Sequence, residues 1–315
     1  MSNKFRALLA LVVTVAISLN STLAQADVTP TSTPSSTPTI AVLDTAIDDS
    51  LPIFAGKIVD EVCIVDWTSC PNGKSFMEGS GAATMPTNLI TLNGFEHGTQ
   101  MTSIVVANNP NVNIVFLKVI GNTANGARQI SFESTVYNAL NWVYANKVKW
   151  NIQAVTMSQG HHNLLMGANY CPATPQTRAA VSKLISVGIP TFFPAGNGRD
   201  YSRLDWPACI EDSISVGAVD QIGEITSYSN FDSNKLDFLA LGNMPATKPG
   251  GVVVNVAGTS AATAVAAAQW VALKQAKPNL SYADELALLT STTKISVGRQ
   301  GSSNKLINLG AALAK

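Results

Sequence analysis

The sequence predicts an α/β fold in which a mostly parallel, doubly wound sheet lies between two layers of helices, a three-layer α/β/α arrangement. Near-continuous apolar runs, typical of strands buried on both faces, alternate along the chain with segments whose apolar residues recur at three- and four-residue spacing. No linker-like segment interrupts residues 39–315 and no internal repeat is visible, so we expect one domain over this range.

The expected strands are short apolar runs. They lie at residues 39–44, 113–120, 153–158, 189–196, 213–219 and 250–258. Each is apolar almost throughout, which favours parallel strands that are covered on both faces. The sequence therefore predicts that all of these runs belong to one buried sheet.

The expected helices lie between and after these strands. Residues 97–108, 131–146 and 175–187 show apolar side chains at helical spacing, and each segment ends at or beside a Gly or Asn. Two further helices are expected at residues 260–276 and 281–291. Ser281 and Asp284 form a capping box at the start of the last one.

The composition bounds the class of protein. The 315 residues are 46% apolar and 13% charged, with a formal net charge of zero. Such a chain can bury a large core, and it has no electrostatic bias toward nucleic acid or anionic membranes. We therefore expect a soluble globular protein that binds no nucleic acid and, once its signal peptide is removed, no membrane.

The N-terminal residues indicate export. Residues 1–26 resemble a secretory signal peptide, because two basic residues precede the apolar run 7–19 and small residues lead to Ala26. A membrane anchor is the alternative, but the run has about 13 residues and a span needs about 20. Residues 27–38 are rich in Thr, Pro and Ser, and we expect an extended spacer there. Secretion to the medium or the periplasm is predicted.

The four cysteines fit an oxidising compartment. Four cysteines allow three pairings. The pairing of Cys63 with Cys70, which leaves Cys171 with Cys209, is favoured because these two are close in sequence at the short turn 66–73. A metal site is the alternative, but the sequence lacks the close cysteine pairs and cysteine-flanked histidines of such sites, and we expect no metal ligands.

In a doubly wound sheet, ligands bind at the carboxyl ends of the strands, and reactive side chains are expected there. Asp44 ends the strand 39–44 and could orient an imidazole or cap the following turn. Of the three histidines, His97 stands at a loop-to-helix junction, while His161 and His162 share one loop. His97 is therefore the candidate general base, although an isolated histidine is also compatible with a structural role.

Two further candidates carry hydrogen-bonding groups. Asn197 follows the strand-like run 189–194 between two glycines, where its amide could stabilise an oxyanion or simply form a turn. Ser260 follows Gly258 and Thr259 at the start of an Ala-rich helix. A helix start favours negative charge, so Ser260 is a candidate nucleophile, but the same position also suits an ordinary N-cap.

These residues together resemble the subtilisin-like serine proteases, the subtilases. The matching motifs are VLDTAID at Asp44, EHGTQMTSIV at His97, PAGNG at Asn197 and VAGTSAAT at Ser260. The chain order Asp, His, Ser is that of subtilisin and differs from the orders in trypsin-like enzymes and in α/β-hydrolases. The resemblance extends from about residue 39 to the C-terminus.

The resemblance implies a secreted serine endopeptidase that forms an acyl-enzyme. Ser260 would attack the scissile carbonyl, His97 would take its proton and pass it to the leaving amine, and Asp44 would hold and support His97. Asn197 and the Ser260 N–H would form the oxyanion hole.

The resemblance also implies an extended polypeptide substrate, bound as an added strand. The substrate-binding residues that it assigns are Ser158, Gln159, Gly160, Ala195, Gly196 and Gly121. The segment after Gly121 would flank the peptide on one side, as far as Asn125 and Gly126. Ala195 and Gly196 would form the wall of the pocket for the side chain before the cleaved bond. Because these residues are small, the pocket is expected to accept a sizeable apolar side chain, unless the nearby His161 or His162 alters this preference.

The sequence departs from the family where the nucleophile helix begins. Members usually have Met, Pro and His where this chain has Ala261, Ala264 and Val265. The absence of a proline at Ala264 is expected to straighten the first helical turns and leave more room near Ser260. We therefore hypothesise that the acyl-enzyme passes to amines more readily than is usual.

The resemblance implies no catalytic cofactor, and a monomer is expected. A structural calcium ion is compatible with the family, but no ligand set is assigned, since Asp48 and Asp49 fit a solvated turn.

The family's folding-assisting prodomain is not evident between the signal and the domain. The alternatives are a catalytically silent, subtilase-like binding protein and a transpeptidase or ligase.

Overall fold

The structure is a computed structural model, and it describes residues 36–66, 69–91, 94–123, 125–129, 132–161, 171, 174–298 and 302–315. The predicted signal peptide, most of the predicted spacer and His162 lie outside these residues. All described residues belong to one compact unit that begins at Pro34.

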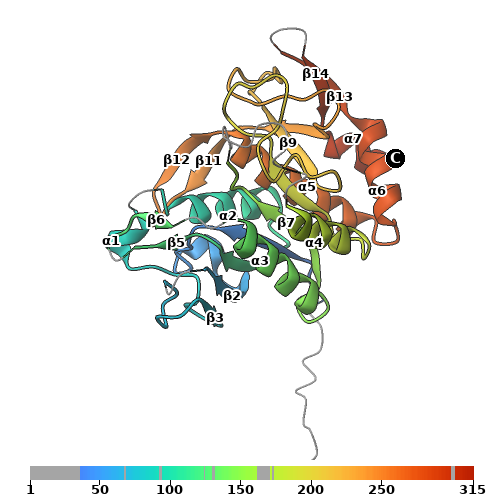
Figure 1. Ribbon diagram of the computed structural model, residues 1–315. Helices are drawn as coiled ribbons and strands as arrows, with labels where there is room; N and C mark the ends of the chain where they lie inside the picture. Colours follow the sequence, from blue (N-terminus) through green and yellow to red (C-terminus); the bar gives the residue numbers. More distant parts are fainter. Residues whose placement is uncertain are drawn as a thin grey trace, which may run out of the picture. The chain divides into compact units, whose positions relative to one another are not determined.

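The unit is built on a ten-stranded sheet (Figure 1). In spatial order the strands are β13 (Lys294–Val297), β14 (Ser303–Leu306), β10 (Phe238–Leu241), β9 (Ile214–Val219), β8 (Thr191–Pro194), β7 (Ile152–Met157), β1 (Thr39–Asp44), β4 (Asn113–Lys118), β2 (Ile58–Ile64) and β3 (Phe76–Glu78). Neighbours from β14 to β2 run parallel, and only the outermost strands β13 and β3 pair in antiparallel fashion. The predicted mostly parallel, doubly wound sheet is confirmed.

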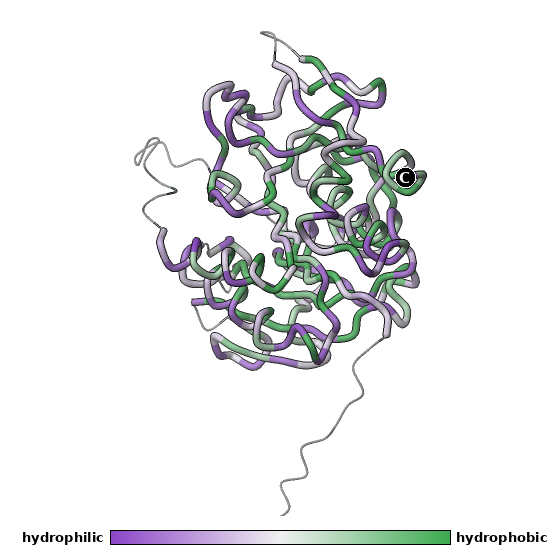
Figure 2. Tube along the Cα trace, turned by 90° about the vertical axis from the view of Figure 1, so that its right-hand side faces the viewer, coloured by the Kyte–Doolittle hydropathy of each residue, from purple (hydrophilic) through white to green (hydrophobic). Residues whose placement is uncertain are grey.

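Helices cover the sheet on two sides. The longer helices are α2 (His97–Asn108), α3 (Phe132–Asn146), α4 (Pro175–Ile185), α5 (Thr259–Ala276) and α6 (Tyr282–Thr292). Along β1, Ile40 and Val42 join a core with α2 and α5, whereas Ala41 and Leu43 join a second core with α3 and α4. This alternation gives the three-layer architecture that was predicted. In Figure 2 hydrophobic stretches gather toward the middle of the trace, and many of the outer segments are hydrophilic.

The remaining elements are short. They are the 3-10 helix η1 (Pro52–Phe54), the helices α1 (Thr87–Ile90) and α7 (Leu309–Ala314), and the strand pairs β5 (Gly121–Asn122) with β6 (Arg128–Gln129) and β11 (Asn243–Thr247) with β12 (Val253–Ala257). The N-cap part of the predicted capping box is present, since the Ser281 hydroxyl accepts from the Asp284 N–H at 3.2 Å and donates to the Asp284 carboxylate at 2.6 Å.

Helix α5 is buried along most of its length because its sequence is rich in alanine. Residues 261–268 are all buried, and these small side chains allow the helix to approach β7, β8, β9 and β10 closely. Trp270 fills the space farther along and meets the Phe192 ring edge-on at 5.7 Å. The helix therefore projects its first residues, including Ser260, at the carboxyl edge of the sheet.

The prediction that residues 250–258 form a strand of the main sheet is wrong. Residues 250–258 do not enter the main sheet; β12 pairs antiparallel with β11, and its residues alternate between exposed and half-buried. Gly250 and Gly251 have φ angles of 83° and 85° and turn the chain back from β11. The position beside β9 belongs instead to β10, a four-residue strand that the sequence analysis did not identify.

Both favoured disulfides are present, Cys63 with Cys70 and Cys171 with Cys209. Within the described part of the chain, no helix is long and apolar enough to cross a membrane. The same residues contain no group of three or more His, Cys, Asp or Glu side chains placed to hold a metal ion.

Candidate active site

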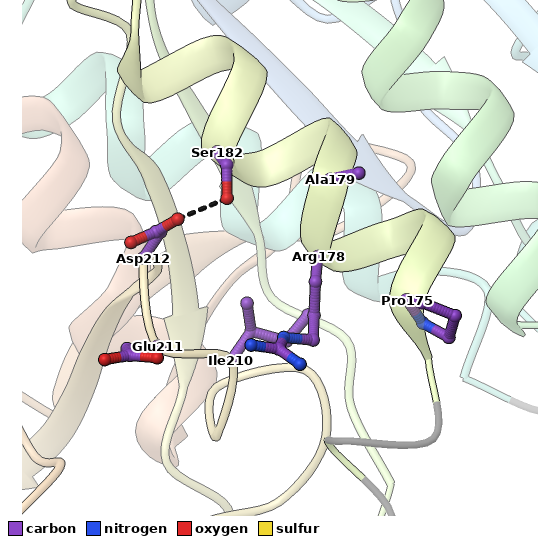
Figure 3. Close-up of a pocket in the computed structure, with 7 residues that line it drawn as sticks. All are labelled: Pro175, Arg178, Ala179, Ser182, Ile210, Glu211 and Asp212. Atoms are coloured by element: carbon purple, nitrogen blue, oxygen red, sulfur yellow. Dashed lines mark hydrogen bonds between the residues drawn. The ribbon is translucent and has the colours of Figure 1, made fainter.

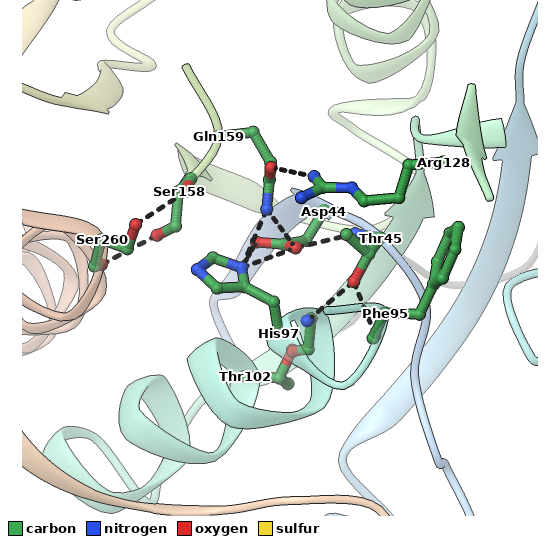
Figure 4. Close-up of polar contacts among 10 residues, drawn as sticks. Asp44, Thr45, Phe95, His97, Thr102, Arg128, Ser158, Gln159 and Ser260 are labelled. Atoms are coloured by element: carbon green, nitrogen blue, oxygen red, sulfur yellow. Dashed lines mark hydrogen bonds and ion pairs between the residues drawn. The ribbon is translucent and has the colours of Figure 1, made fainter. Parts of the chain in front are cut away.

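Asp44 is the last residue of the central strand β1, and its side chain is fully buried at the carboxyl edge of the sheet. A buried carboxylate requires hydrogen-bond donors. The Thr45 N–H donates to Oδ1 at 2.7 Å and Gln159 Nε2 donates to Oδ1 at 2.8 Å. His97 Nδ1 lies 2.9 Å from Oδ1 and 3.0 Å from Oδ2 (Figure 4). The structure thus brings Asp44 and His97 together as a bonded pair.

His97 is the first residue of α2, and its neighbours fix this helix start against the end of β1. Thr45 Oγ1 accepts from the Gly98 N–H at 3.0 Å and donates to the Phe95 carbonyl at 2.7 Å. A Cβ on Gly98 would lie 2.3 Å from the Ala46 carbonyl oxygen, so only glycine permits this approach. The imidazole therefore has a defined position, with 26% of its side chain exposed.

The bond to Asp44 decides which ring nitrogen of His97 is basic. An ionised carboxylate only accepts hydrogen bonds, so the proton of a neutral ring bonded to Asp44 lies on Nδ1. Nε2 then carries the free lone pair. In Figure 4 this outer nitrogen points toward the side on which Ser260 lies.

Gln159 adds a contact that the sequence analysis did not foresee. Its Nε2 lies 2.8 Å from His97 Nδ1 as well as from Asp44, and its Oε1 accepts from the guanidinium of Arg128 at 2.7 Å. Because a guanidinium has no acceptor, it selects the amide oxygen and turns the amide nitrogen toward the Asp44–His97 pair. A ring that accepted from Gln159 at Nδ1 would carry its proton on Nε2 and could not act as a base.

Arg128 reaches Gln159 from the short strand β6. Burial lowers the pKa of the Arg128 guanidinium, and the nearby charge of Asp44 acts in the opposite direction. Its Nε is buried without a partner among the described residues. Arg128 and Gln159 are separated by 31 positions, and no local sequence pattern links them, so only the fold reveals this pair.

Ser260 is the second residue of α5. The helix is capped by Gly258, so the alternative interpretation of Ser260 as an ordinary N-cap is wrong. Ser260 Oγ donates to the Ser158 carbonyl at 2.9 Å, and Ser158 Oγ donates back to the Ser260 carbonyl at 2.9 Å. The hydroxyl of Ser260 is therefore bonded to Ser158 and not to His97 in this structure. Catalytic hydrogen bonds are often long or misaligned without substrate, so this geometry leaves Ser260 a candidate nucleophile.

Asn197 lies in the loop after β8, and Thr259 fixes its side-chain amide. The Thr259 N–H and hydroxyl donate to Asn197 Oδ1 at 2.9 and 3.0 Å. Both are donors here, so they select the amide oxygen and leave Nδ2 to donate elsewhere. The Thr259 hydroxyl also accepts from the Gly196 N–H at 3.3 Å. This arrangement suits a side chain that donates to a developing oxyanion.

A pocket of about 160 Å³ joins these groups. Its lining residues are His97, Arg128, Ser158, Gln159, Gly160, Pro194, Gly196, Asn197, Asp205, Thr259 and Ser260. Asp44 lies behind His97 and is fully buried, as is Ala195. Gly121 lies in β5, on the strand that pairs with the strand of Arg128, and does not line this pocket. Asp205 lines it although the sequence analysis did not identify this residue.

A second pocket, of about 240 Å³, lies between α4 and residues 210–212 (Figure 3). Ser182 donates to Asp212 there, and Arg178 points to the same space. No histidine lines this pocket, so among its described residues Ser182 has no imidazole base. The pocket near His97 is therefore the stronger candidate site.

The fold and this Asp-His pair beside a helix-borne serine define a site of the serine-hydrolase kind. The family model of the subtilases matches residues 35–307, and the chain belongs to the subtilase family. The resemblance inferred from the motifs is thereby confirmed.

Individual relatives agree with this assignment. The alkaline protease of Alkalihalobacillus alcalophilus is 29% identical over 213 residues, 64% of this chain and 50% of that protein. The major intracellular serine protease of Bacillus subtilis is 26% identical over 237 residues, 71% of this chain and 64% of that protein. The chain thus spans about half to two thirds of the length of these relatives.

Solved structures share the fold. The prenylagaramide maturation protease PagA superposes with a TM-score of 0.63 at 18% identity, covering 88% of this chain and 92% of that one. A cold adapted subtilisin-like serine proteinase superposes with a TM-score of 0.64 at 22% identity, covering 85% and 87%. At these identities the similarity establishes the architecture.

Proposed function

We propose that the protein is a secreted serine endopeptidase that hydrolyses polypeptides through an acyl-enzyme. The observation that carries the proposal is the bonded Asp44–His97 pair, in which His97 lines the same pocket as Ser260 while Asp44 lies buried behind it. Membership of the subtilase family supports it. The disulfides and the signal-like N-terminus support secretion, although at least two of the similar proteins are intracellular proteases.

The reaction begins when the Ser260 hydroxyl leaves the Ser158 carbonyl and donates to His97 Nε2. Ser260 Oγ then forms a bond to the carbonyl carbon of the substrate while its proton passes to Nε2. Asp44 accepts from Nδ1 and stabilises the imidazolium that results. His97 gives the proton to the leaving amine, and a water molecule later hydrolyses the ester by the same steps in reverse order.

The oxyanion of the tetrahedral intermediate is stabilised by hydrogen-bond donors. We assign this role to Asn197 Nδ2 and the Ser260 N–H. Asn197 suits it because Thr259 holds the amide by its oxygen, so the amide nitrogen needs no reorientation during the reaction. Such preorganised donors contribute most where water is excluded.

The substrate is proposed to lie extended along residues 158–160, which follow β7 and line the pocket. The backbone of Gln159 and Gly160 would pair with the peptide, while the Gln159 side chain remains engaged with Asp44. Gly196 would wall the pocket for the side chain before the cleaved bond, and the segment from Gly121 would flank the other side of the peptide.

The test exposes the protein purified from the secreted fraction to a fluorophosphonate probe and to casein, beside the Ser260→Ala variant. Labelling and casein cleavage by the parent alone are expected, because the probe traps an activated serine. Asp212→Asn, which changes a carboxylate of the second pocket, is the matched control and should behave as the parent. A folded parent that neither labels nor cleaves would instead support the catalytically silent binding protein.

A further inference from the structure

We propose that Arg128 is a positioning residue for the proposed reaction, because it fixes the side-chain amide of Gln159 against the Asp44–His97 pair. The inference rests on the proposed endopeptidase function and adds a residue that acts on His97 through other side chains. It is carried by a continuous row of side-chain hydrogen bonds that begins at Arg128 and ends at His97 (Figure 4).

The two oxygens of the Asp44 carboxylate have different partners. Oδ1 accepts from the Thr45 N–H at 2.7 Å and from Gln159 Nε2 at 2.8 Å, and His97 Nδ1 lies 2.9 Å away. Among the contacts of the described residues, Oδ2 has His97 Nδ1 as its partner, at 3.0 Å. Because two donors already occupy Oδ1, they leave Oδ2 as the acceptor for the ring N–H. Gln159 therefore helps to decide where on the carboxylate His97 is held.

The orientation of the Gln159 amide decides whether it supports or opposes this pair. With its nitrogen inward, the amide donates to the ionised Asp44, and a bond to a charged acceptor is stronger than one to a neutral acceptor. With its oxygen inward, two acceptors would meet where 2.8 Å now separates Gln159 Nε2 from Asp44 Oδ1. Such a contact disfavours the ionised carboxylate on which the imidazolium of His97 depends.

Arg128 makes this choice because a guanidinium carries donors only. Its Nη2 donates to Gln159 Oε1 at 2.7 Å, so the amide nitrogen is left to face inward. Within the described part of the chain, no ion pair joins Arg128 to a carboxylate. A half-buried cation without such a pair is costly in itself, so the bond to Gln159 is the interaction that accounts for its position.

The strand that carries Arg128 is tied to the same edge of the sheet. β6 pairs with β5, where Asn122 lies opposite Arg128. Asn122 Oδ1 accepts from Lys118 Nζ at 3.0 Å, and the Asn122 N–H donates to Ser69 Oγ at 3.2 Å. Lys118 ends β4 and lies beside Asp44 in the parallel pairing of β1 and β4. Arg128 thus projects from a segment that is anchored next to the strand ending at Asp44.

The test compares Arg128→Lys, Arg128→Gln and Arg178→Gln in steady-state kinetics on one quenched peptide. A lysine ammonium also carries donors only, so we expect Arg128→Lys to keep kcat within about twofold of the parent. The amide introduced in Arg128→Gln can donate or accept, so it selects neither orientation of Gln159. Its kcat should fall about threefold to tenfold with KM little changed.

Arg178→Gln is the matched control, because it makes the same change at an exposed position of α4, and it should behave as the parent. Equal kcat in Arg128→Gln and the parent would overturn the inference. So would a loss in Arg128→Lys as large as that in Arg128→Gln, because the selection of the amide oxygen would then not matter.

A double-mutant cycle tests whether Arg128 acts through Gln159. Gln159→Leu leaves no amide to orient, so adding Arg128→Gln to it should lower kcat by less than about twofold further. A further loss in the double variant as large as the loss in Arg128→Gln alone would mean that Arg128 acts by another route, and would overturn the inference.

A measurement without turnover separates this inference from the proposed catalysis. The ring nitrogens of the three histidines are observed by NMR in protein with isotope-labelled histidine, in the Ser260→Ala background, and His97→Gln assigns the His97 signals. We expect Arg128→Gln to shift or broaden the His97 Nδ1–H signal, and Arg178→Gln to leave it unchanged.

The outcomes of this measurement are distinct. A His97 signal that depends on Arg128, in a protein whose parent does not react with fluorophosphonate, would sink the proposed function and keep the inference. A signal that is the same in Arg128→Gln would sink the inference alone. A ring proton found on Nε2 would mean that Gln159 Nε2, 2.8 Å from Nδ1, donates to His97 and holds it in the non-basic form, which would also overturn the inference.

Discussion

The two halves of the proposed active site are built in different ways. The acid–base half consists of Asp44, His97, Gln159 and Arg128, and its members are bonded to one another side chain to side chain. The nucleophile half consists of Ser158, Asn197, Thr259 and Ser260, and its bonds run mainly between side chains and backbone. The difference teaches that His97, the proposed base, is already oriented in this structure, whereas Ser260, the proposed nucleophile, must still exchange its hydrogen bond to Ser158 for one to His97.

The largest effect is expected from Asp44→Asn, which breaks the acid–base half. The new amide can donate to His97 Nδ1, as Gln159 can, and the ring would then carry its proton on Nε2. Loss of the orienting carboxylate in serine proteases lowers kcat by about 10⁴-fold, and we expect a loss of that order. Single-turnover kinetics would check this. Unchanged turnover in Asp44→Asn would show that His97 does not depend on this pair.

The next effect is expected in the nucleophile half, from Asn197→Ala. Removing one oxyanion donor costs about 10²- to 10³-fold in kcat in this class of enzyme, with little change in KM. Steady-state kinetics on a quenched peptide would measure both. Asn197→Asp is an informative partner variant, because Thr259 can still donate to it but it offers no N–H to the oxyanion. Equal activity of parent and Asn197→Ala would assign the oxyanion hole elsewhere.

A smaller effect is expected from Gln159→Leu, which retains the acid–base pair and removes the amide that competes for His97 Nδ1. Asp44 loses one of its donors while Thr45 and His97 remain. We expect a change of about tenfold or less in kcat, accompanied by a shift in the pH at which kcat/KM reaches half its maximum. A purely structural role would lower stability without moving that pH. Gln159→Glu should bind Arg128 more strongly and repel Asp44.

The smallest effect on activity is expected from Glu285→Gln in α6, outside both halves. Burial raises the pKa of Glu285 to about 8, and its Oε1 has no partner among the described residues. The folded pKa lies above the unfolded value of about 4.5, so this group lowers the stability of the folded state as pH rises from about 4.5 to about 8.

We therefore expect the free energy of unfolding of Glu285→Gln to exceed that of the parent by about 1–3 kcal/mol near pH 8, and to differ less near pH 4. Urea titrations at the two pH values would measure it. The kcat of the variant at 25 °C should equal that of the parent. A stability gain that is the same at both pH values would contradict the assigned titration.

Much of this molecule could be predicted from local sequence. The apolar runs and helical spacings located β1, β4, β7, β8, β9 and the longer helices, because burial on both faces leaves a clear pattern. The same pattern failed for residues 250–258, since an apolar run does not show which sheet it enters. The paired glycines at the start of the run decided this by reversing the chain.

Within the site, the motifs identified Asp44, His97, Asn197 and Ser260. All four stand at the ends of helices or strands or in the loops beside them. The structure places them around one pocket, with Asp44 behind it. The contacts of Arg128 and Gln159 beside the Asp44–His97 pair, and the position of Asp205 on the pocket wall, depend on which distant segments meet, and sequence spacing does not record that. The sequence does show a polar residue, Gln159, just after a strand that ends at the predicted catalytic edge. It does not show that the Gln159 side chain turns toward Asp44 and His97.

The burial of α5 also bears on how the protein ages in solution. We expect the backbone amides of this buried helix to be among the last to exchange with solvent, because core helices open with free energies close to that of global unfolding. We expect heat, or digestion by the proposed protease itself, to inactivate each affected molecule completely. The molecules that remain folded should keep full specific activity. A stored sample would therefore lose active-site titre and total activity in proportion, with kcat per titrated site unchanged.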